Sequence, residues 1–325
     1  MKGISVVIPT CNRRARLLAL LEDLGKSSCP PREVLIVDSS DLPMDEAAFL
    51  PFPTLRIRYI TSRKSVCVQR NLGIKEAAGE WIFLCDDDIE VPIDYLARLS
   101  AHLAEHPEAG AVSGLVRQRE GGQWVDQYPL GSSLHLLWRW AFQLGIWGEI
   151  QCRGPLIDWL VERYHKSGNH LSKAGWPVVT EVRGAFFRTP IYGLGASLVR
   201  KDWLLASPYD ESLDAHGMGD NYGVAIGFPA EGIHVVTDAY VYHHEAQENR
   251  LPEGRAYARR LMALDHFIRT RKELAAVESN WFLWSLVGSA ILHGVAGNPT
   301  LCKATLGVLG TLVLRPRNAP APGRP

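Results

Sequence analysis

The sequence lacks several patterns that would place it in a common functional class. None of its six cysteines forms a C-x-x-C pair, which argues against a zinc site, a redox motif or a disulfide framework. No G-x-G-x-x-G or G-x-x-x-x-G-K-[ST] phrase follows its first apolar run, which counts against a dinucleotide oxidoreductase and a P-loop NTPase. Its 35 basic and 35 acidic residues balance, so we expect no nucleic-acid partner.

The chain also has no long apolar run near its first residue. The run from Ile4 to Ile8 ends at Pro9, which is too short for the hydrophobic region of a signal peptide. Scattered cysteines of this kind are typical of reduced thiols in a cytosolic protein. We therefore expect a cytoplasmic protein, and its 325 residues allow one elaborate domain or two smaller ones.

Strand-like and helix-like segments alternate over the first 116 residues. Apolar runs at 4–8, 33–37, 56–60, 81–85 and 109–116 predict strands, and leucines at helical spacing predict helices between them. This alternation predicts an α/β fold with a doubly wound, mostly parallel sheet flanked by helices. Ligands of such sheets lie outside the carboxyl ends of the strands, so loops 9–13, 38–40 and 86–88 should converge.

Three consecutive carboxylates, Asp86, Asp87 and Asp88, follow the predicted strand at 81–85. An unpaired ionised carboxylate is very costly to bury, so this run needs either a cation or solvent. A hard divalent ion such as Mg²⁺ or Mn²⁺ prefers oxygen ligands and keeps positions for substrate phosphates. The run therefore predicts either a metal-assisted diphosphate site or a solvated acidic turn.

Several phrases occur in a fixed order around this run. They are Val6 to Arg13, Val37 to Ser40, Arg70 to Ile74, Ala78 to Glu80 and Asp86 to Asp88, with a second group near 180–245. Together they resemble family 2 glycosyltransferases, which have the GT-A fold. The resemblance implies metal-dependent transfer of a sugar, with inversion, from a nucleotide-sugar donor to a carbohydrate or lipid-linked acceptor. The expected role is cell-surface polysaccharide or glycolipid synthesis.

The same resemblance implies roles on the donor side. Asp38 would bond the nucleotide base, Asp86 would reach the ribose or donor sugar, and Asp88 would ligate Mg²⁺ or Mn²⁺ on the diphosphate. Asp87 would hold the turn, and Cys11 stands where some members carry an aromatic residue that stacks on the base. The complete predicted donor-binding set is Pro9, Cys11, Asp38, Arg70, Asn71, Asp86 and Asp87.

The acceptor side rests on the second group of phrases. Family members carry a Gly-Glu-Asp phrase with the general base, whereas this chain reads Gly219-Asp220-Asn221. Asp220 is therefore the predicted base, and capping of a helix at 221–227 is the structural alternative. After a strand at 232–242, His243 or His244 is expected to complete the metal site, with His243 preferred. A solvated loop is the alternative for these histidines.

The predicted domain organisation has three parts. A GT-A-like catalytic domain at 1–250 comprises a nucleotide-binding half (1–116), a Trp-rich insertion that forms an acceptor lid or simply packs (117–180), and an acceptor and base half (181–250). A helical C-terminal appendage follows at 251–314. Its apolar runs are too short to predict a membrane-spanning helix. They predict helices that lie at the cytoplasmic membrane surface, or else a buried hairpin or dimer contact. A disordered, proline-rich tail is expected at 315–325.

Two other functions stay open from the sequence. A nucleotidyltransferase can use a similar sheet and acidic metal site, although no glycine-rich basic loop follows the first strand. A non-catalytic carbohydrate- or membrane-binding scaffold is the second, favoured by the Gly-Asp-Asn phrase.

Overall fold

The computed structural model describes residues 3–229, 231–244 and 251–314. Their contacts divide into two compact units. As far as described residues extend, the first unit comprises Met1–Asp126, Arg183–Gly217 and Gly227–Arg250, and the second comprises Gln127–Val182, Met218–Ile226 and Leu251–Pro325. Each unit is therefore assembled from segments that lie far apart in the sequence.

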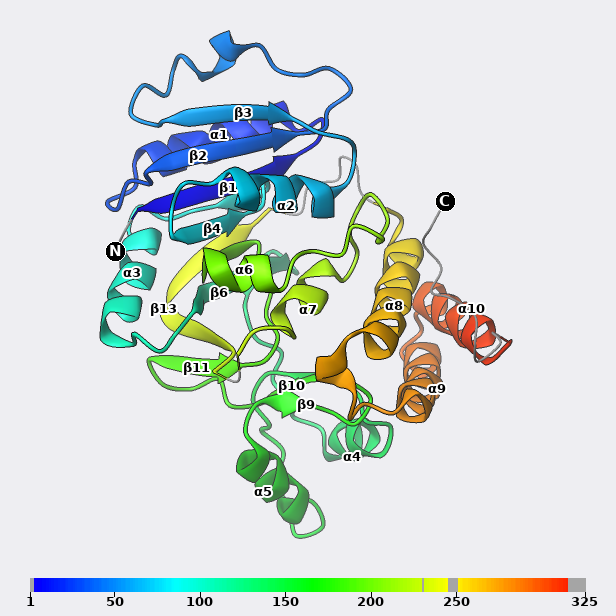
Figure 1. The fold of residues 1–325 in the computed structure, drawn as a ribbon. Helices are drawn as coiled ribbons and strands as arrows, with labels where there is room; N and C mark the ends of the chain where they lie inside the picture. Colours follow the sequence, from blue (N-terminus) through cyan, green and yellow to red (C-terminus); the bar gives the residue numbers. More distant parts are fainter. Residues whose placement is uncertain (1–2, 230, 245–250, 315–325) are drawn as a thin grey trace. The chain divides into compact units, whose positions relative to one another are not determined.

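The first unit is built on a mixed sheet whose main path runs in the order β11-β13-β6-β12-β4-β1-β2-β3 (Figure 1). Two short strands lie off this path, since β5 pairs with β13 and β7 with β6. The strand bounds are β1 Ile4–Thr10, β2 Glu33–Asp38, β3 Ile57–Thr61, β4 Trp81–Cys85, β5 Ile89–Glu90, β6 Ala111–Glu120, β7 Gln123–Val125, β11 Phe186–Thr189, β12 Ala196–Arg200 and β13 Ile233–His243.

The strands β3, β2, β1 and β4 are parallel neighbours, as the alternation of the sequence predicts. Beyond them β12 runs antiparallel to both β4 and β6, and β13 is parallel to β6. Because β4, β1 and β2 are adjacent and parallel, the loops that follow them leave the sheet at the same edge.

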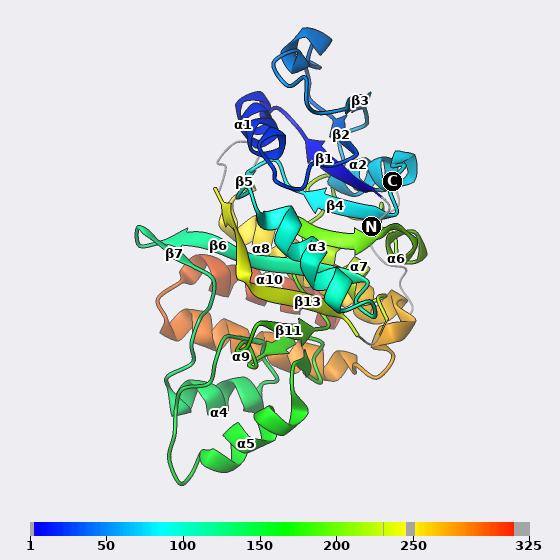
Figure 2. The same cartoon turned by 90° about the vertical axis from the view of Figure 1, so that its left-hand side faces the viewer.

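Helices cover both faces of this sheet, as Figures 1 and 2 show for α1 and α2. Successive side chains of a strand point to opposite faces, so Val6 packs in the cluster that includes α1 leucines, whereas Val7 faces Gly73 of α2. The helices of the unit are α1 Arg14–Gly25, α2 Val66–Glu76, α3 Tyr95–Glu105 and α6 Lys201–Ala206, with a 3₁₀ turn η1 at Glu46–Phe49.

The second unit is mainly helical and contains a small sheet in the order β8-β10-β9. Its elements are α4 Ser133–Ala141, β8 Ile146–Trp147, α5 Asp158–Ser167, β9 His170–Leu171, β10 Pro177–Val179, α7 Asp220–Ala225, α8 Glu253–Thr270, η2 Lys272–Leu274, α9 Ser279–Val295 and α10 Pro299–Leu314. No described helix is both long and apolar enough to cross a membrane.

Residues 127–180 of the Trp-rich insertion and the C-terminal helices belong to this same unit. The indole of Trp138 in α4 donates to the Gly288 carbonyl of α9 at 3.2 Å, and that of Trp284 donates to the Ala141 carbonyl at 2.9 Å. Phe142 stacks on Trp284 with ring centroids 4.6 Å apart. These tryptophans therefore join α4 to α9 within the unit, with Trp138 partly buried and Trp284 45% exposed. The predicted domain boundaries stay a prediction, and the tail at 315–325, with Arg315 and Arg317, lies outside the described residues.

Candidate functional site

The loops after β1, β2 and β4 lie against one another, as predicted. The Thr10 hydroxyl donates to Asp87 Oδ2 at 2.7 Å, and the Ser39 amide donates to the Thr10 carbonyl at 3.0 Å. From α2, the Gln69 side-chain amide donates to the Thr10 and Val37 carbonyls, both at 2.7 Å. Gln69 is buried, and its two hydrogen bonds fix the spacing between the ends of β1 and β2 from the face of the sheet that α2 covers.

The three carboxylates after β4 differ in burial. The Asp86 side chain is 32% exposed, whereas those of Asp87 and Asp88 are 4% and 6% exposed. Each one has a basic partner: Arg70 Nη2 lies 2.6 Å from Asp86 Oδ1, and Arg13 Nη1 lies 2.8 Å from Asp87 Oδ1 and 3.2 Å from Asp88 Oδ2. The acidic turn is therefore largely buried and charge-paired, not a solvated loop.

Burial perturbs the protonation of this turn. It raises the pKa of Asp87 to about 6, and the neighbouring Asp88 carboxylate acts in the same direction, while the Arg13 guanidinium opposes both. Burial also raises the pKa of the Cys85 thiol, with the adjacent carboxylates adding to the effect. Cys85 is consequently a protonated, packed thiol at neutral pH. None of the six cysteines, all of which lie in the described part of the chain, forms a disulfide.

The two histidines that follow β13 have different neighbours. His243 Nε2 lies 3.3 Å from Asp88 Oδ1, and its side chain is 21% exposed. His244 Nε2 lies 2.9 Å from Glu90 Oε2, and its ring meets Trp124 edge to face. The segment that follows β13 is joined to the acidic turn by the His244 amide, which donates to the Asp88 carbonyl at 2.9 Å. His243 is therefore the histidine that stands beside the acidic turn; Glu245 lies outside the described residues.

The donor chemistry at Asp88 and His243 fits a divalent cation that shares its coordination with a substrate. One carboxylate and one imidazole are suitable ligands for Mg²⁺ or Mn²⁺ that otherwise coordinate phosphate oxygens and water. Among the described residues, no group of three or more His, Cys, Asp or Glu side chains is arranged to hold a metal by itself. Such an ion would consequently take its remaining ligands from water or from a bound substrate.

Asp38 lies buried at the end of β2. Its Oδ1 accepts hydrogen bonds from the Ser40 amide at 2.7 Å and the Ser40 hydroxyl at 2.5 Å, and its Oδ2 accepts one from the Tyr59 hydroxyl at 2.5 Å. Burial and the bond to Asp38 raise the pKa of Tyr59 to about 12. Pro9 is buried within β1, and Cys11 Sγ contacts the Ser39 carbonyl at 3.5 Å. Contact of Pro9, Cys11 and Asp38 with a base stays a prediction.

Arg70 and Asn71 make internal contacts that support this region. The Arg70 side chain is buried beneath Asp86, and its guanidinium lies 5.1 Å from the centre of the Tyr209 ring. Asn71 Nδ2 donates to the Tyr209 carbonyl and to Glu211 Oε1, both at 2.9 Å, and its Oδ1 accepts from the Tyr209 amide. The two residues thus join α2 to the acidic turn and to segment 209–211. Whether they also contact the donor stays a prediction.

Asp220, the predicted base, belongs to the second unit. It is the first residue of α7 and is buried, and its Oδ1 accepts a hydrogen bond from the Asn221 amide at 2.6 Å. The preceding Gly219 has φ +90°, a conformation that L side chains rarely adopt. The helix begins one residue earlier than predicted, so Asp220 lies inside its first turn.

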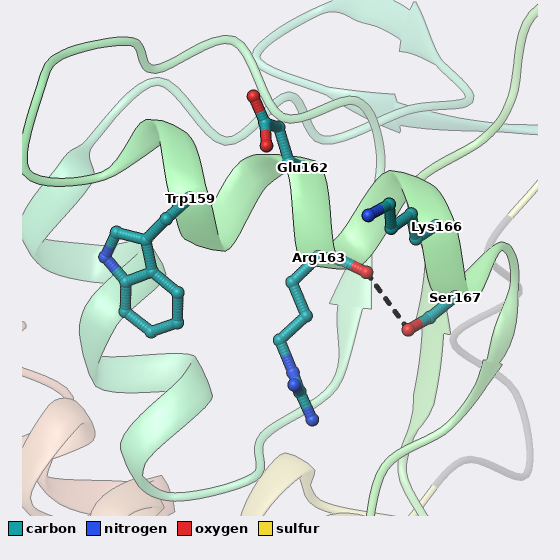
Figure 3. Close-up of a pocket in the computed structure, with 5 residues that line it drawn as sticks. All are labelled: Trp159, Glu162, Arg163, Lys166 and Ser167. Carbon is teal, nitrogen blue, oxygen red and sulfur yellow. Dashed lines mark hydrogen bonds between the residues drawn. The ribbon is translucent and has the colours of Figure 1, made fainter.

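The second unit carries an open hollow along α5, lined by Trp159, Glu162, Arg163, Lys166 and Ser167 (Figure 3). The indole of Trp159 is about half exposed, and the charged side chains of the hollow come from the same helix. None of the predicted site residues lines it. An exposed aromatic face beside charged donors and acceptors is a suitable surface for a sugar ring.

Comparison with known proteins fits this geometry. Residues 5–155 match the family model described as "Glycosyl transferase family 2". Residues 5–155 are therefore similar to family 2 glycosyltransferases. This region contains β1, β2, β4 and the acidic turn, which are the parts of the site that the sequence phrases predicted.

Relatives of known sequence agree with this assignment. A PGL/p-HBAD biosynthesis glycosyltransferase of Mycobacterium bovis is 36% identical over 133 residues, covering 39% of this chain and 52% of the relative. An uncharacterized glycosyltransferase, YwdF, of Bacillus subtilis is 36% identical over 86 residues, covering 26% of this chain and 32% of the relative. The chain thus spans about half the length or less of these curated relatives.

The fold matches that of GT-A glycosyltransferases. The mannosyltransferase PcManGT of Pyrobaculum calidifontis, solved in complex with GDP-Man and Mn²⁺, superposes with a TM-score of 0.52 at 18% identity. The match covers 97% of this chain and 76% of the mannosyltransferase. The chain and this mannosyltransferase therefore share a fold.

Sequence reasoning missed several residues that shape the site. Arg13 and Thr10 lie in the first recognised phrase, yet nothing in the sequence indicates that both bind Asp87. Tyr59 lies in a predicted strand and Gln69 in a predicted helix, but nothing in the sequence marks either side chain as part of the site. Gly195 had a signal, because it lies in a small-residue stretch: a Cβ at this position would be 2.0 Å from Asp86 Oδ2.

Proposed function

We propose that the chain is a glycosyltransferase that moves a sugar from a nucleoside diphosphate sugar to an acceptor hydroxyl with inversion, in cell-surface polysaccharide or glycolipid synthesis. The observation that supports this most is the buried acidic turn of the family 2 region, with Asp88 beside His243 at the carboxyl end of the sheet. Asp38, Asp86 and the Pro9–Cys11 loop are proposed to bind the nucleotide and the donor sugar.

Asp88 and His243 are the proposed holders of a divalent ion, Mg²⁺ or Mn²⁺. Bound there, the ion would neutralise charge on the departing diphosphate. Asp87 does not contribute a free carboxylate in this arrangement, because Thr10 and Arg13 already bind it. Its proposed role is to hold the turn so that Asp86 and Asp88 keep their orientations.

Asp220 is proposed as the general base. Inverting transfer requires a group that takes the proton from the attacking hydroxyl. Support comes from the sequence phrase, in which Asp220 is the one carboxylate, and from its place in the first turn of a short helix after a glycine with φ +90°. Its burial keeps the carboxylate away from bulk water, which favours proton transfer from a bound acceptor.

The acceptor is proposed to contact the Trp-rich part of the second unit. The hollow of α5 supplies an exposed indole for a sugar face and basic groups for polar contacts (Figure 3). Replacing Trp159 by alanine should raise the KM for the acceptor about tenfold and leave the KM for the donor unchanged. Equal effects on both constants would count against an acceptor role.

The experiment for the function is a screen of nucleoside diphosphate sugars, with release of nucleoside diphosphate measured with Mn²⁺ and with chelator. We expect Mn²⁺-dependent release with one donor class. Asp88→Ala and Asp220→Asn should abolish transfer while circular dichroism stays that of the wild type. Asp94→Asn is the matched control, because Asp94 is half exposed and its carboxylate pairs with the exposed Arg98.

Three outcomes would contradict the proposal. Wild-type turnover by Asp88→Ala or Asp220→Asn would remove these residues from the mechanism. Pyrophosphate formation from a nucleoside triphosphate and a sugar phosphate would instead identify a nucleotidyltransferase. Sugar binding without any release of nucleoside diphosphate would identify a non-catalytic scaffold.

The chain is also proposed to associate with the cytoplasmic face of a membrane through α9 and α10. Between Ser279 and Leu314 the sequence has one charged residue, Lys303. Several large apolar side chains of these helices are exposed: Trp284, Ile291, Val295, Leu306, Val313 and Leu314. Exposed helix faces without charges are unusual in water and suit a helix lying in the membrane interface.

A further inference from the structure

The guanidinium of Arg13 is shared between two carboxylates with different proposed roles. Arg13 directly precedes α1, and one nitrogen, Nη1, lies 2.8 Å from Asp87 Oδ1 and 3.2 Å from Asp88 Oδ2. The side chain is only 17% exposed. A cation held at this depth is weakly screened by water, so its position strongly affects the charge that each carboxylate presents.

Asp87 holds Arg13 more firmly than Asp88 does. The Arg13–Asp87 distance is the shorter of the two, and Asp87 is itself oriented by the Thr10 hydroxyl at 2.7 Å. Asp88 divides its oxygens, since Oδ2 faces Arg13 and Oδ1 faces His243 at 3.3 Å. Asp87 therefore acts as a tether: it holds the Arg13 guanidinium closer to itself than to Asp88, so that Arg13 compensates the Asp88 charge less.

The physical consequence concerns any second cation at Asp88. A divalent ion and a guanidinium that approach the same carboxylate repel one another, and each lowers the affinity of the site for the other. The more closely the Arg13 guanidinium is held by Asp87, the less it neutralises Asp88, and the more strongly Asp88 can attract a metal ion. The position of the guanidinium between the two carboxylates thus sets the affinity of the site for a divalent cation.

We propose that Arg13 is a positioning residue that tunes the affinity of the Asp88–His243 pair for a divalent cation, and that Asp87 sets the degree of tuning by tethering Arg13. The inference rests on the proposed function only in assigning a divalent cation to this pair. When the pair is loaded, Arg13 keeps its bond to Asp87 and gives up its contact with Asp88.

The inference predicts changes of opposite sign from neighbouring substitutions. In Asp87→Asn the tether loses its charge, the guanidinium moves closer to Asp88, and the Kd for Mn²⁺ should rise about tenfold. In the double variant Arg13→Met with Asp87→Asn the competing cation is gone as well, and the Kd should fall about tenfold below that of the wild type. Arg13→Lys keeps the charge and should stay within about threefold of the wild type.

Mn²⁺ binding is measured by isothermal titration calorimetry on the full chain without nucleotide, and thermal unfolding of each protein checks that it is folded. The double variant is the safeguard for folding, because it removes both members of a buried pair and leaves the net charge of the turn unchanged. A wild type that binds too weakly to measure still supports the inference if the double variant binds Mn²⁺. A purely structural role for Arg13 would weaken binding in both variants.

The inference is overturned if Asp87→Asn and the double variant shift the Kd in the same direction, or if all four proteins agree within about twofold. It is also overturned if no protein binds Mn²⁺. Failure of the inference and failure of the proposed function are distinguishable, because sugar transfer is assayed separately on the wild type. Mn²⁺-dependent transfer with equal Mn²⁺ affinities would reject the role of Arg13 alone.

Discussion

Gly195 shows how a single missing side chain allows the acidic turn to form. The Asp86 amide donates to the Gly195 carbonyl at 2.8 Å, which draws the two backbones together. The Asp86 carboxylate then lies where a Cβ of residue 195 would be. The close approach of turn and backbone leaves room only for glycine.

Gly195→Ala should therefore displace Asp86 from Arg70. We expect the KM for the nucleotide-sugar donor to rise about tenfold, because Asp86 would no longer present its carboxylate in the same orientation. Steady-state kinetics of nucleoside diphosphate release measures this. Gly193→Ala is the matched control, because nothing lies within 4 Å of a Cβ there, and its kinetics should equal those of the wild type. Unchanged donor KM in Gly195→Ala would show that Asp86 does not contact the donor.

Between elements, α9 approaches α4 through another glycine. A Cβ at Gly288 would lie 2.3–2.6 Å from atoms of the Phe142 side chain. Gly288→Ala should force α4 and α9 apart and lower the free energy of unfolding by about 1–3 kcal/mol, since overpacking of a filled interior is destabilising. Thermal unfolding measures the change.

The control for this substitution lies on the neighbouring helix. Gly310 of α10 has nothing within 4 Å of an added Cβ. Gly310→Ala should therefore raise stability by about 0.5–1 kcal/mol through helix propensity alone. If both substitutions stabilised the protein, the close contact of α4 with α9 would be incorrect.

A buried pair of histidines joins α3 to β13 in the first unit. His102 Nε2 and His234 Nδ1 are 2.9 Å apart, and His234 is fully buried. Burial lowers the pKa of His234 to about 4, with Arg188 and His102 acting in the same direction, His106 adding a smaller contribution and Glu108 opposing them. An unfolded histidine titrates near 6.5, so the unfolded chain binds more protons between these values.

Stability should accordingly fall as the pH drops from about 6.5 towards 4. The contribution of His234 is on the order of 3 kcal/mol. His234→Gln keeps a hydrogen-bonding side chain but does not titrate, so its free energy of unfolding in urea should depend less on pH than that of the wild type. His165→Gln, at an exposed position of α5, should follow the wild type. Identical pH dependence in all three proteins would contradict the prediction.

At the scale of the whole molecule, the exposed apolar side chains of α9 and α10 should determine whether the protein associates with membranes. Truncation is a poor test, because Phe282 and Leu286 of α9 are buried and their loss would expose the interior. Glutamate at exposed positions is sharper: Ile291→Glu, Val295→Glu and Leu306→Glu should abolish sedimentation with vesicles of phosphatidylcholine and phosphatidylglycerol.

Leu205→Glu is the control, since Leu205 is also an exposed leucine on a helix but lies in the first unit. It should sediment with vesicles as the wild type does. Analytical ultracentrifugation separates the remaining alternative: variants that lose a dimer but still bind vesicles would assign the face to self-association.

Much of the donor side follows from the sequence alone. Buried strands that end in polar residues, separated by helical patterns, predict a parallel sheet and hence the edge where Thr10, Asp38 and Asp86 meet. This works because side-chain periodicity is a local property, and the adjacency of parallel strands follows from simple connection rules. The same reasoning did not reveal β12, which runs antiparallel between β4 and β6.

Which side chains pair with the acidic turn was decided only by the tertiary structure. His243 rather than His244 faces Asp88, Arg70 lies beneath Asp86, and Arg13 is divided between Asp87 and Asp88. These pairings depend on strand register and on packing between segments remote in the sequence, where a shift of one residue turns a side chain to the other face. The sequence by itself determined that carboxylates gather at this edge of the sheet, and tertiary packing determined which charge each of them meets.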